Sequence, residues 1–229
     1  SGSASRVVNA MPPMVDPNAK PAYPSRRRRA AQKDSVRALE YGTLLEVTPF
    51  LEPSRPVLEK ARRALERLTV ADVPPSAHSA VYFSAHDGFH HLLRPYLLGL
   101  VNARLGDLAA AERYAGTLAR ETGPPAAATL PRDLALEIRA EAAIMQGAPA
   151  LALAPLRQTV GETWYEYHFS SPFLAGSRGR YRRAGLEAAH GEARQALALF
   201  SGFEGFSGYA LIYAAPSHLR RAQLFERLG

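Results

Sequence analysis

The chain has 229 residues, 47% of them hydrophobic, and a formal net charge of +7 at pH 7, values that suit a folded globular protein. It has no cysteine, no apolar run near the ~18 residues of a transmembrane helix and no apolar signal-peptide core, which excludes disulfides, thiolate chemistry and a membrane span. Because only three of its 28 basic residues are lysines, as in arginine-rich proteins from GC-rich genomes, we expect a bacterial cytoplasmic protein.

The first 33 residues differ in composition from the rest of the chain. They hold five prolines, few periodic apolar positions and four consecutive arginines at positions 26–29. This pattern predicts a disordered basic leader over residues 1–33. A solvated linker is the simplest interpretation, and contact of the basic run with nucleic acid or an anionic membrane surface is the alternative.

Ordered structure is expected from residue 34 onward, where Asp34 and Ser35 can cap a first helix. Beyond the break at Pro53 and Pro56, apolar residues at positions 58, 61, 65 and 68 follow a helical period. We therefore predict an amphipathic helix there, followed by helical repeats to the end of the chain. The predicted helical-repeat domain covers residues 34–229.

A similar sequence segment occurs four times from residue 96 onward, at residues 96–114, 139–156, 183–200 and 221–229. Aligned on their turn glycines (Gly106, Gly147, Gly191 and Gly229), the copies lie 41, 44 and 38 residues apart. A period in this range is typical of stacked helix–turn–helix units, in which glycine supplies the left-handed residue that ends the first helix. The fourth copy reaches only its turn glycine, so we predict a truncated last repeat.

Small residues recur at matching places in these copies, and they resemble the tetratricopeptide repeat (TPR) family. The family has a small residue at its eighth position, alanine at the twentieth and a larger apolar residue at the twenty-fourth. In this chain the eighth positions are Gly99, Ala140, Ala184 and Ala222, the twentieths are Ala111, Ala152 and Ala196, and the twenty-fourths are Ala115, Leu156 and Phe200. Small residues let two helices approach closely, and the larger one fills the space toward the next pair.

The resemblance implies an all-α fold, a right-handed α-solenoid of antiparallel helical hairpins. It further implies that the first helices line a concave groove that binds other proteins, and it implies no reaction. Two features depart from the family. The period exceeds the family's length of about 34 residues, and the seventh position, usually apolar, is arginine at Arg139, Arg183 and Arg221.

Basic residues crowd the first helices of the third and fourth units. If these helices line the groove, Arg180, Arg183 and Arg221, with Tyr181, form a binding site for an acidic peptide, a terminal carboxylate or a phosphate. The alternative is a solvated outer face whose arginines pair with carboxylates such as Glu187 of the same chain.

Two further groups of residues carry weaker signals. Trp164, Tyr165 and Tyr167 cluster in a connection between units, either as an aromatic contact for a partner or as fill that anchors the connection. His86 and His90 are four residues apart, as in HExxH zinc sites, but Asp87 replaces the glutamate and Gly88 weakens the helix. We expect polar residues around a turn there, with no metal and no other cofactor.

The sequence thus predicts a non-catalytic protein–protein interaction module, a scaffold-type part of a larger regulatory or signalling protein. Its expected partner is a protein or peptide, acidic in character. The first alternative is a nucleic-acid-binding helical array that uses the basic leader and the arginines near residue 180. The second is a metal-dependent hydrolase built on His86 and His90. Self-association through the truncated last repeat is a further way to bury the exposed final helix.

Overall fold

The structure, a computed structural model, describes residues 42, 45, 53–67, 90–123, 127–161, 173, 175–203 and 208–229. The described residues form helices and contain no strand, which confirms the all-α prediction for this part of the chain. The predicted leader at residues 1–33 and the predicted cap at Asp34 and Ser35 lie outside the described residues. The helices are α2 (Arg55–Arg67), α3 (His90–Leu105), α4 (Leu108–Leu118), α5 (Leu130–Met145), α6 (Pro149–Arg157), α8 (Ser177–Ala189), α9 (Ala193–Ser201), α10 (Gly208–Leu211) and α11 (Ala214–Leu228).

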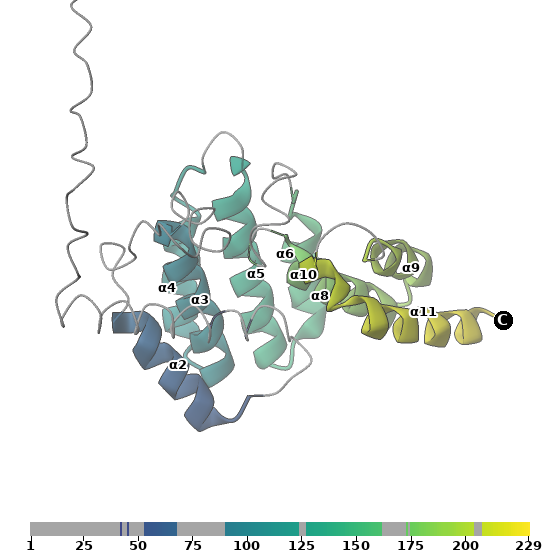
Figure 1. The fold of residues 1–229 in the computed structure, drawn as a ribbon, viewed down its shortest axis with the longest axis horizontal. Coiled ribbons are helices and arrows are strands. Elements are labelled where there is room, and N and C mark those ends of the chain that lie inside the picture. Colours follow the sequence, from purple (N-terminus) through teal and green to yellow (C-terminus); the bar gives the residue numbers. More distant parts are fainter. Residues whose placement is uncertain are drawn as a thin grey trace, which may run out of the picture.

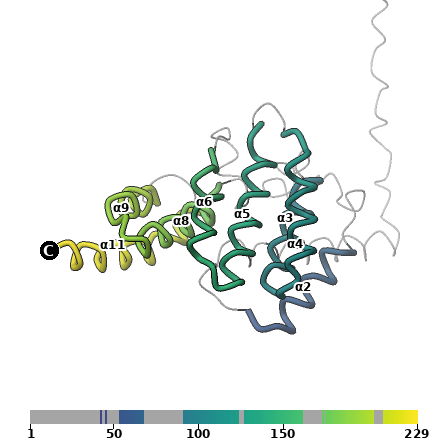
Figure 2. The backbone as a smooth tube through the Cα atoms, turned by 180° about the vertical axis from the view of Figure 1, so that it is seen from behind, coloured from purple at the N-terminus to yellow at the C-terminus, as the bar shows by residue number. Residues whose placement is uncertain are grey.

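Consecutive helices pack against each other in pairs, α3 with α4, α5 with α6 and α8 with α9. The pairs succeed one another along the long axis of the molecule, from α2 at one end to α11 at the other (Figures 1 and 2). Contacts of α4 with α5, α6 with α8 and α9 with α11 join each pair to the next. None of the described helices combines the length and apolar character that crossing a membrane requires.

The turn glycines hold the helix pairs together as the sequence predicts. Gly106, Gly147 and Gly191 have φ values of +83°, +71° and +85°, a left-handed conformation that costs little only for glycine. This conformation turns the next N–H back onto the helix that has just ended. The resulting bonds run from Asp107 N to Asn102 O at 2.9 Å, from Ala148 N to Ala143 O at 3.0 Å and from Glu192 N to Glu187 O at 2.9 Å.

The small residues of the repeats lie in the core. All of the eighth, twentieth and twenty-fourth positions named above are buried except Ala222, which is exposed on α11. A Cβ atom added at Gly99 would stand 2.4 Å from Cδ1 of Ile138, so α3 and α5 can approach this closely only because residue 99 has no side chain. The chain therefore uses small residues where its helices come closest.

The hydrophobic core has its largest part where α3, α4 and α5 meet, with smaller clusters between α5 and α6 and between α2 and α3. A separate cluster joins α8, α9 and α11 and contains Phe200, Phe203 and Tyr213. Phe203 is fully buried. These clusters fix the relative positions of the first helices.

Enlarging a buried alanine tests this packing. We expect Ala196→Leu to lower the free energy of unfolding by about 1–3 kcal/mol, because Ala196 is fully buried between α8 and α9 and its neighbours have no space for three more carbons. Ala198→Leu on the exposed face of α9 is the control, and it should change stability by less than about 0.5 kcal/mol. Urea unfolding followed by circular dichroism measures both. Equal midpoints for the two variants would contradict the assignment of Ala196 to the helix–helix contact.

Candidate functional site

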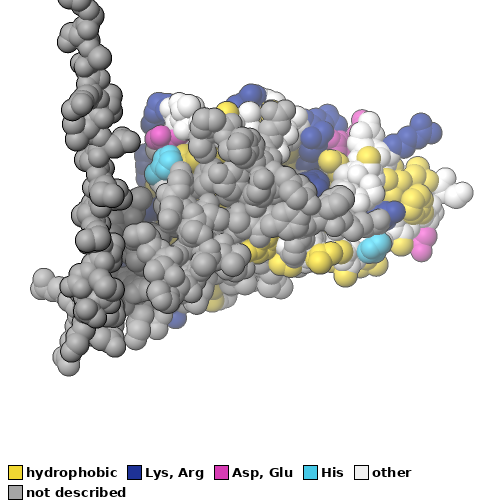
Figure 3. All heavy atoms as spheres, turned by 45° about the horizontal axis from the view of Figure 1, so that its top comes forward, with side chains coloured by type: hydrophobic (Ala, Val, Ile, Leu, Met, Phe, Trp, Pro, Cys, Tyr) yellow, Lys and Arg dark blue, Asp and Glu magenta, His cyan; other side chains and the backbone are white. Residues whose placement is uncertain are grey.

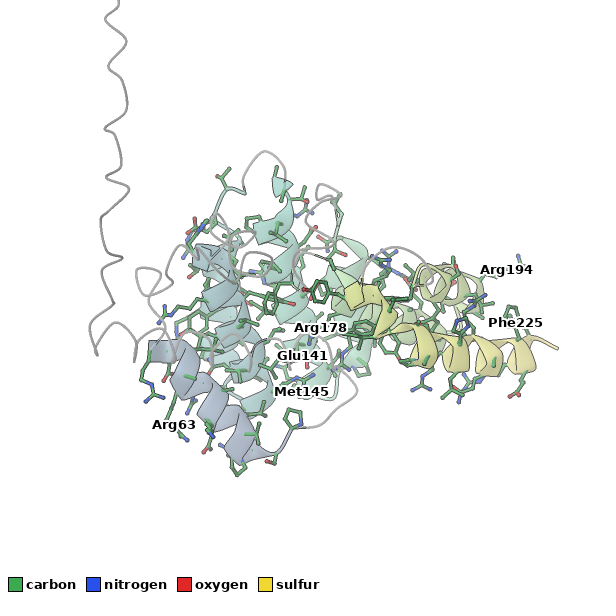
Figure 4. All side chains as sticks on the ribbon, viewed as in Figure 1. Arg63, Glu141, Met145, Arg178, Arg194 and Phe225 are labelled. Atoms are coloured by element: carbon green, nitrogen blue, oxygen red, sulfur yellow. The ribbon has the colours of Figure 1, made fainter. Side chains whose placement is uncertain are left out.

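A groove of about 860 Å³ on the described surface receives side chains from the first helix of every pair. We refer to it as the arginine groove. Its described lining includes Arg104 of α3, Ile144 and Met145 of α5, Tyr181, Arg182 and Leu186 of α8, Phe200 of α9, and Arg220, Gln223, Leu224 and Arg227 of α11. Met145 lies one turn after Glu141 on α5, near the middle of the molecule (Figure 4).

The charged residues in the described lining of the arginine groove are all positive. Four arginines contribute to the described lining, and no Asp or Glu is among those residues. Arg220 and Arg227 are exposed, and because they are seven residues apart they stand two turns apart on the same side of α11. Arg220 Nη1 donates a hydrogen bond to Gln223 Oε1 at 3.1 Å, which orients its guanidinium. The groove therefore offers fixed cations above an apolar floor.

A buried carboxylate lies directly behind the groove. Glu141 of α5 is 1% exposed and accepts an ion pair from Arg104 Nε at 2.9 Å. Arg178 Nη2 binds its other oxygen at 2.5 Å, and Arg182 Nη2 lies 3.5 Å from Oε1. Since Arg104 belongs to α3 and the other two to α8, this single carboxylate connects three successive helix pairs.

The environment of Glu141 keeps it ionised. Burial by itself would raise the pKa of a carboxyl group, but the charges of Arg178, Arg182 and Arg104 outweigh it and hold the pKa of Glu141 at about 2. Burial is the main reason that the pKa of Arg182 is lowered. The charge of Glu141 opposes this shift, and the charge of Arg178 adds to it. With the groove-facing Arg104 and Arg182 anchored in this way, their guanidinium groups are held in place before any ligand arrives.

Two other acidic residues extend this buried row along α5. Glu137 accepts a hydrogen bond from the Tyr96 hydroxyl at 2.7 Å and from Arg178 Nη1 at 3.4 Å. Burial raises the pKa of Glu137, because one arginine and one phenol compensate it less than three arginines compensate Glu141. Asp133 accepts from the Gly161 N–H at 2.8 Å, which fastens the segment after α6 to α5.

This row was missed in the sequence analysis. Its signal is the four-residue spacing of Asp133, Glu137 and Glu141, which places the three carboxylates on one side of α5. Arg178 and Arg182 show the same spacing on α8. Matching acidic and basic rows on two helices indicate ion pairs between them.

The predicted site residues lie partly outside the arginine groove. Tyr181 lines it and packs edge-on against Phe200, with ring centroids 5.6 Å apart. Arg180 instead donates to the Gly202 carbonyl at 3.0 Å, and its guanidinium lies 5.2 Å from the centre of the Phe203 ring. Burial of this side chain lowers the pKa of Arg180. Arg180 therefore helps to fix the end of α9.

The arginines at the seventh position also have contacts within the chain. Arg139 Nη2 pairs with Glu112 Oε1 of α4 at 2.7 Å. Arg183 Nε lies 3.5 Å from Glu187 Oε1, and the same carboxylate accepts from Arg157 Nε of α6 at 3.0 Å. A hydrogen bond from Arg157 is the main reason that the pKa of Glu187 is lowered. Arg139 thus replaces an apolar contact between α5 and α4 with an ion pair, whereas Arg183 pairs within α8. Arg221 is half-buried on α11 and is not among the groove-lining residues.

Two of the predicted sites cannot be placed. Trp164, Tyr165, Tyr167 and His86 lie outside the described residues, and of His90 only the backbone, at the start of α3, is described. Over the described part of the chain, no three His, Cys, Asp or Glu side chains come together as a metal site requires. A comparison of the chain with protein-family models, curated proteins and solved structures finds no match.

Proposed function

We propose that this chain is a non-catalytic interaction module, a right-handed TPR-like α-solenoid that binds an acidic segment of a partner protein in the arginine groove. The observation that carries the proposal is the composition of the groove, with four arginines and no described acidic residue around an apolar floor. The contacts between successive helix pairs and the left-handed glycine at each turn support the solenoid. The groove-lining first helices match what the family resemblance implies.

Guanidinium chemistry favours a carboxylate-bearing ligand. Arginine presents a planar set of donors that matches the two oxygens of a carboxylate, and it loses little hydration on pairing. Ile144, Met145 and Leu186 of the floor can receive an apolar side chain between two such contacts. We therefore propose a ligand with acidic residues on both sides of an apolar anchor.

The spacing of the exposed arginines suggests where the acidic residues lie in the ligand. Seven residues of helix separate Arg220 from Arg227, a rise of about 10.5 Å along α11. A polyproline II segment advances ~3.1 Å per residue and has three residues per turn, so two carboxylates three residues apart span a similar distance on one face of the peptide. The preferred ligand is accordingly an extended Glu-x-x-Glu segment with a Leu, Met or Phe between the two glutamates.

The experiment uses fluorescent peptides of this pattern and the double variant Arg220→Glu with Arg227→Glu. Each charge-assisted contact is worth about 1.5–3 kcal/mol, so loss of both should weaken binding by about a hundredfold or more. Fluorescence anisotropy measures the affinity, and circular dichroism checks that the fold is retained. Both side chains are exposed, so the fold should tolerate the changes.

The matched control changes two exposed arginines away from the groove, Arg113→Glu on α4 and Arg120→Glu just after its end. This variant has the same net charge as the groove variant, so any difference between them reports position. We expect the control to bind the peptide almost as wild type does, because exposed charges at a distance are screened by salt. Equal loss in both variants, or tighter binding of an oligonucleotide with a steep salt dependence, would contradict the proposal.

A further inference from the structure

Two of the four groove arginines form a recessed pair. Arg104 Nε and Arg182 Nη2 lie 2.9 Å and 3.5 Å from the same oxygen of Glu141, so their guanidinium groups are neighbours although they come from α3 and α8. Their side chains are 7% and 24% exposed, whereas Arg220 and Arg227 of the same groove are exposed. We refer to Arg104 and Arg182 as the floor pair.

The floor pair belongs to a buried cluster that is positive among the described residues. Glu141 contacts Arg178 in addition to the floor pair, and Arg178 also contacts Glu137. Three arginines therefore stand against two carboxylates. Charges at low exposure act on a ligand more strongly than exposed charges do, because water and salt screen them less. The floor pair thus presents a net positive charge to the groove that it lines.

An apolar surface adjoins the floor pair. Met145 follows Glu141 by one turn on α5, as their neighbouring labels in Figure 4 show. On α8, Leu186 follows Arg182 by one turn, and both Met145 and Leu186 line the groove together with Ile144. A ligand side chain that crosses this surface to the floor pair needs an apolar body and an anionic tip.

We propose that the arginine groove binds a tyrosine-phosphorylated segment of the partner, with the phosphate on the floor pair. This inference rests on the proposed function, and it makes phosphotyrosine the anchor between the two glutamates. The aromatic ring packs on the apolar floor, and the phosphate oxygens accept hydrogen bonds from two guanidinium groups. A phosphate carries about 1.5–2 negative charges at pH 7, which suits a pair of neighbouring cations better than the single charge of a carboxylate.

The recessed position of the floor pair separates phosphotyrosine from other phosphates. In phosphoserine the phosphate stays close to the peptide backbone, and in a nucleic acid it belongs to the backbone itself, so both meet the exposed arginines first. The chain as a whole attracts anionic partners, since its net charge is +7. Lys and Arg side chains recur along the described surface in Figure 3, with few Asp and Glu side chains among them. This field favours association with an anionic segment.

Fluorescence anisotropy with three peptides tests the ligand. The peptides share two glutamates three residues apart and differ only at the anchor, which is tyrosine, phosphotyrosine or phosphoserine. We expect the phosphotyrosine peptide to bind the full chain about thirtyfold or more tightly than the tyrosine peptide, and at least about tenfold more tightly than the phosphoserine peptide. Equal binding of the two phosphopeptides, or tighter binding of an oligonucleotide, would overturn the proposal.

The variant Arg182→Gln tests the position of the phosphate. Arg104 and Arg178 still contact Glu141 in this variant, and circular dichroism checks that the fold is retained. We expect the gain from tyrosine phosphorylation to fall to about threefold or less, with an intermediate gain in Arg182→Lys, which keeps the charge but loses the planar donors. Arg113→Gln, at an exposed site on α4, is the control and should keep the full gain.

The outcomes separate this inference from the proposed function. If the tyrosine peptide binds wild type and phosphorylation adds nothing, the phosphate site is wrong and the acidic-peptide site stands. The same holds if phosphorylation adds equally in wild type and in both Arg182 variants. If none of the three peptides binds, both proposals are wrong.

Discussion

The variant Glu141→Gln is expected to lower the free energy of unfolding by about 3–5 kcal/mol, a large loss for one polar substitution. The amide keeps the shape of the carboxyl group but removes its charge, which leaves Arg104, Arg178 and Arg182 without the anion that they share. Urea unfolding followed by circular dichroism measures the effect. Because the cluster connects α3, α5 and α8, we expect the whole described fold to lose stability and not one helix alone.

The control for this result is Glu112→Gln. Its partner Arg139 is exposed, and exposed ion pairs contribute only about 0–1 kcal/mol. A second control adds Arg178→Met to Glu141→Gln, which removes the excess charge and should recover part of the lost stability. If Glu141→Gln and Glu112→Gln have the same effect, the buried charge cluster does not stabilise the fold.

The stabilising contribution of Glu141 should also depend on pH. The pKa of Glu141 is about 2 in the folded chain against an ordinary value of 4.5, so its stabilising contribution is complete above pH 4.5 and is lost as the pH falls toward 2. The raised pKa of Glu137 acts in the opposite direction, because its protonation favours the folded state. The difference between wild type and Glu141→Gln should therefore shrink across this window. A difference that is independent of pH would contradict the assignment.

A second large effect is expected for Phe203→Ala, which should cost about 3–5 kcal/mol. Phe203 is fully buried between Tyr181 of α8 and Tyr213 at the start of α11, with ring centroids 6.1 Å and 5.5 Å away. The substitution leaves a cavity and also removes the ring beneath the Arg180 guanidinium. Hydrogen exchange should show the loss in α8, α9 and α11 first. Leu151→Ala, at an exposed site, should change stability by less than about 0.5 kcal/mol and serves as the control.

The turns and the closely packed positions could be predicted from the sequence because they depend on local geometry. A left-handed turn requires glycine at Gly106, Gly147 and Gly191, and a close helix crossing requires a small residue such as Ala152 or Ala196. Both requirements act within one repeat, so the recurrence of the repeat reveals them. That recurrence also indicated that Ala222 belongs to the same series.

The partners of the charged residues could not be predicted in the same way. Periodicity tells which side of a helix a residue is on, but it does not tell which helix stands opposite. The sequence predicts Arg183 as a binding residue. In the structure Arg183 lies beside Glu187, and it is Arg182, one residue earlier, that lines the groove. The ion pair of Arg178 with Glu141 joins residues 37 positions apart, which only the packing of α5 near α8 brings together.

The central claim is that the arginine groove recognises acidic residues of a partner, and a charge-reversal titration tests it most directly. Two peptides are compared, a Glu-x-x-Glu segment with an apolar residue between the glutamates and the same segment with two arginines. We predict that wild type binds the first and that Arg220→Glu with Arg227→Glu binds the second. The two mismatched combinations should be weaker by about a hundredfold or more. The groove is not the site of recognition if the double variant binds the acidic peptide as tightly as wild type does. The same conclusion follows if wild type and the double variant bind the arginine peptide equally.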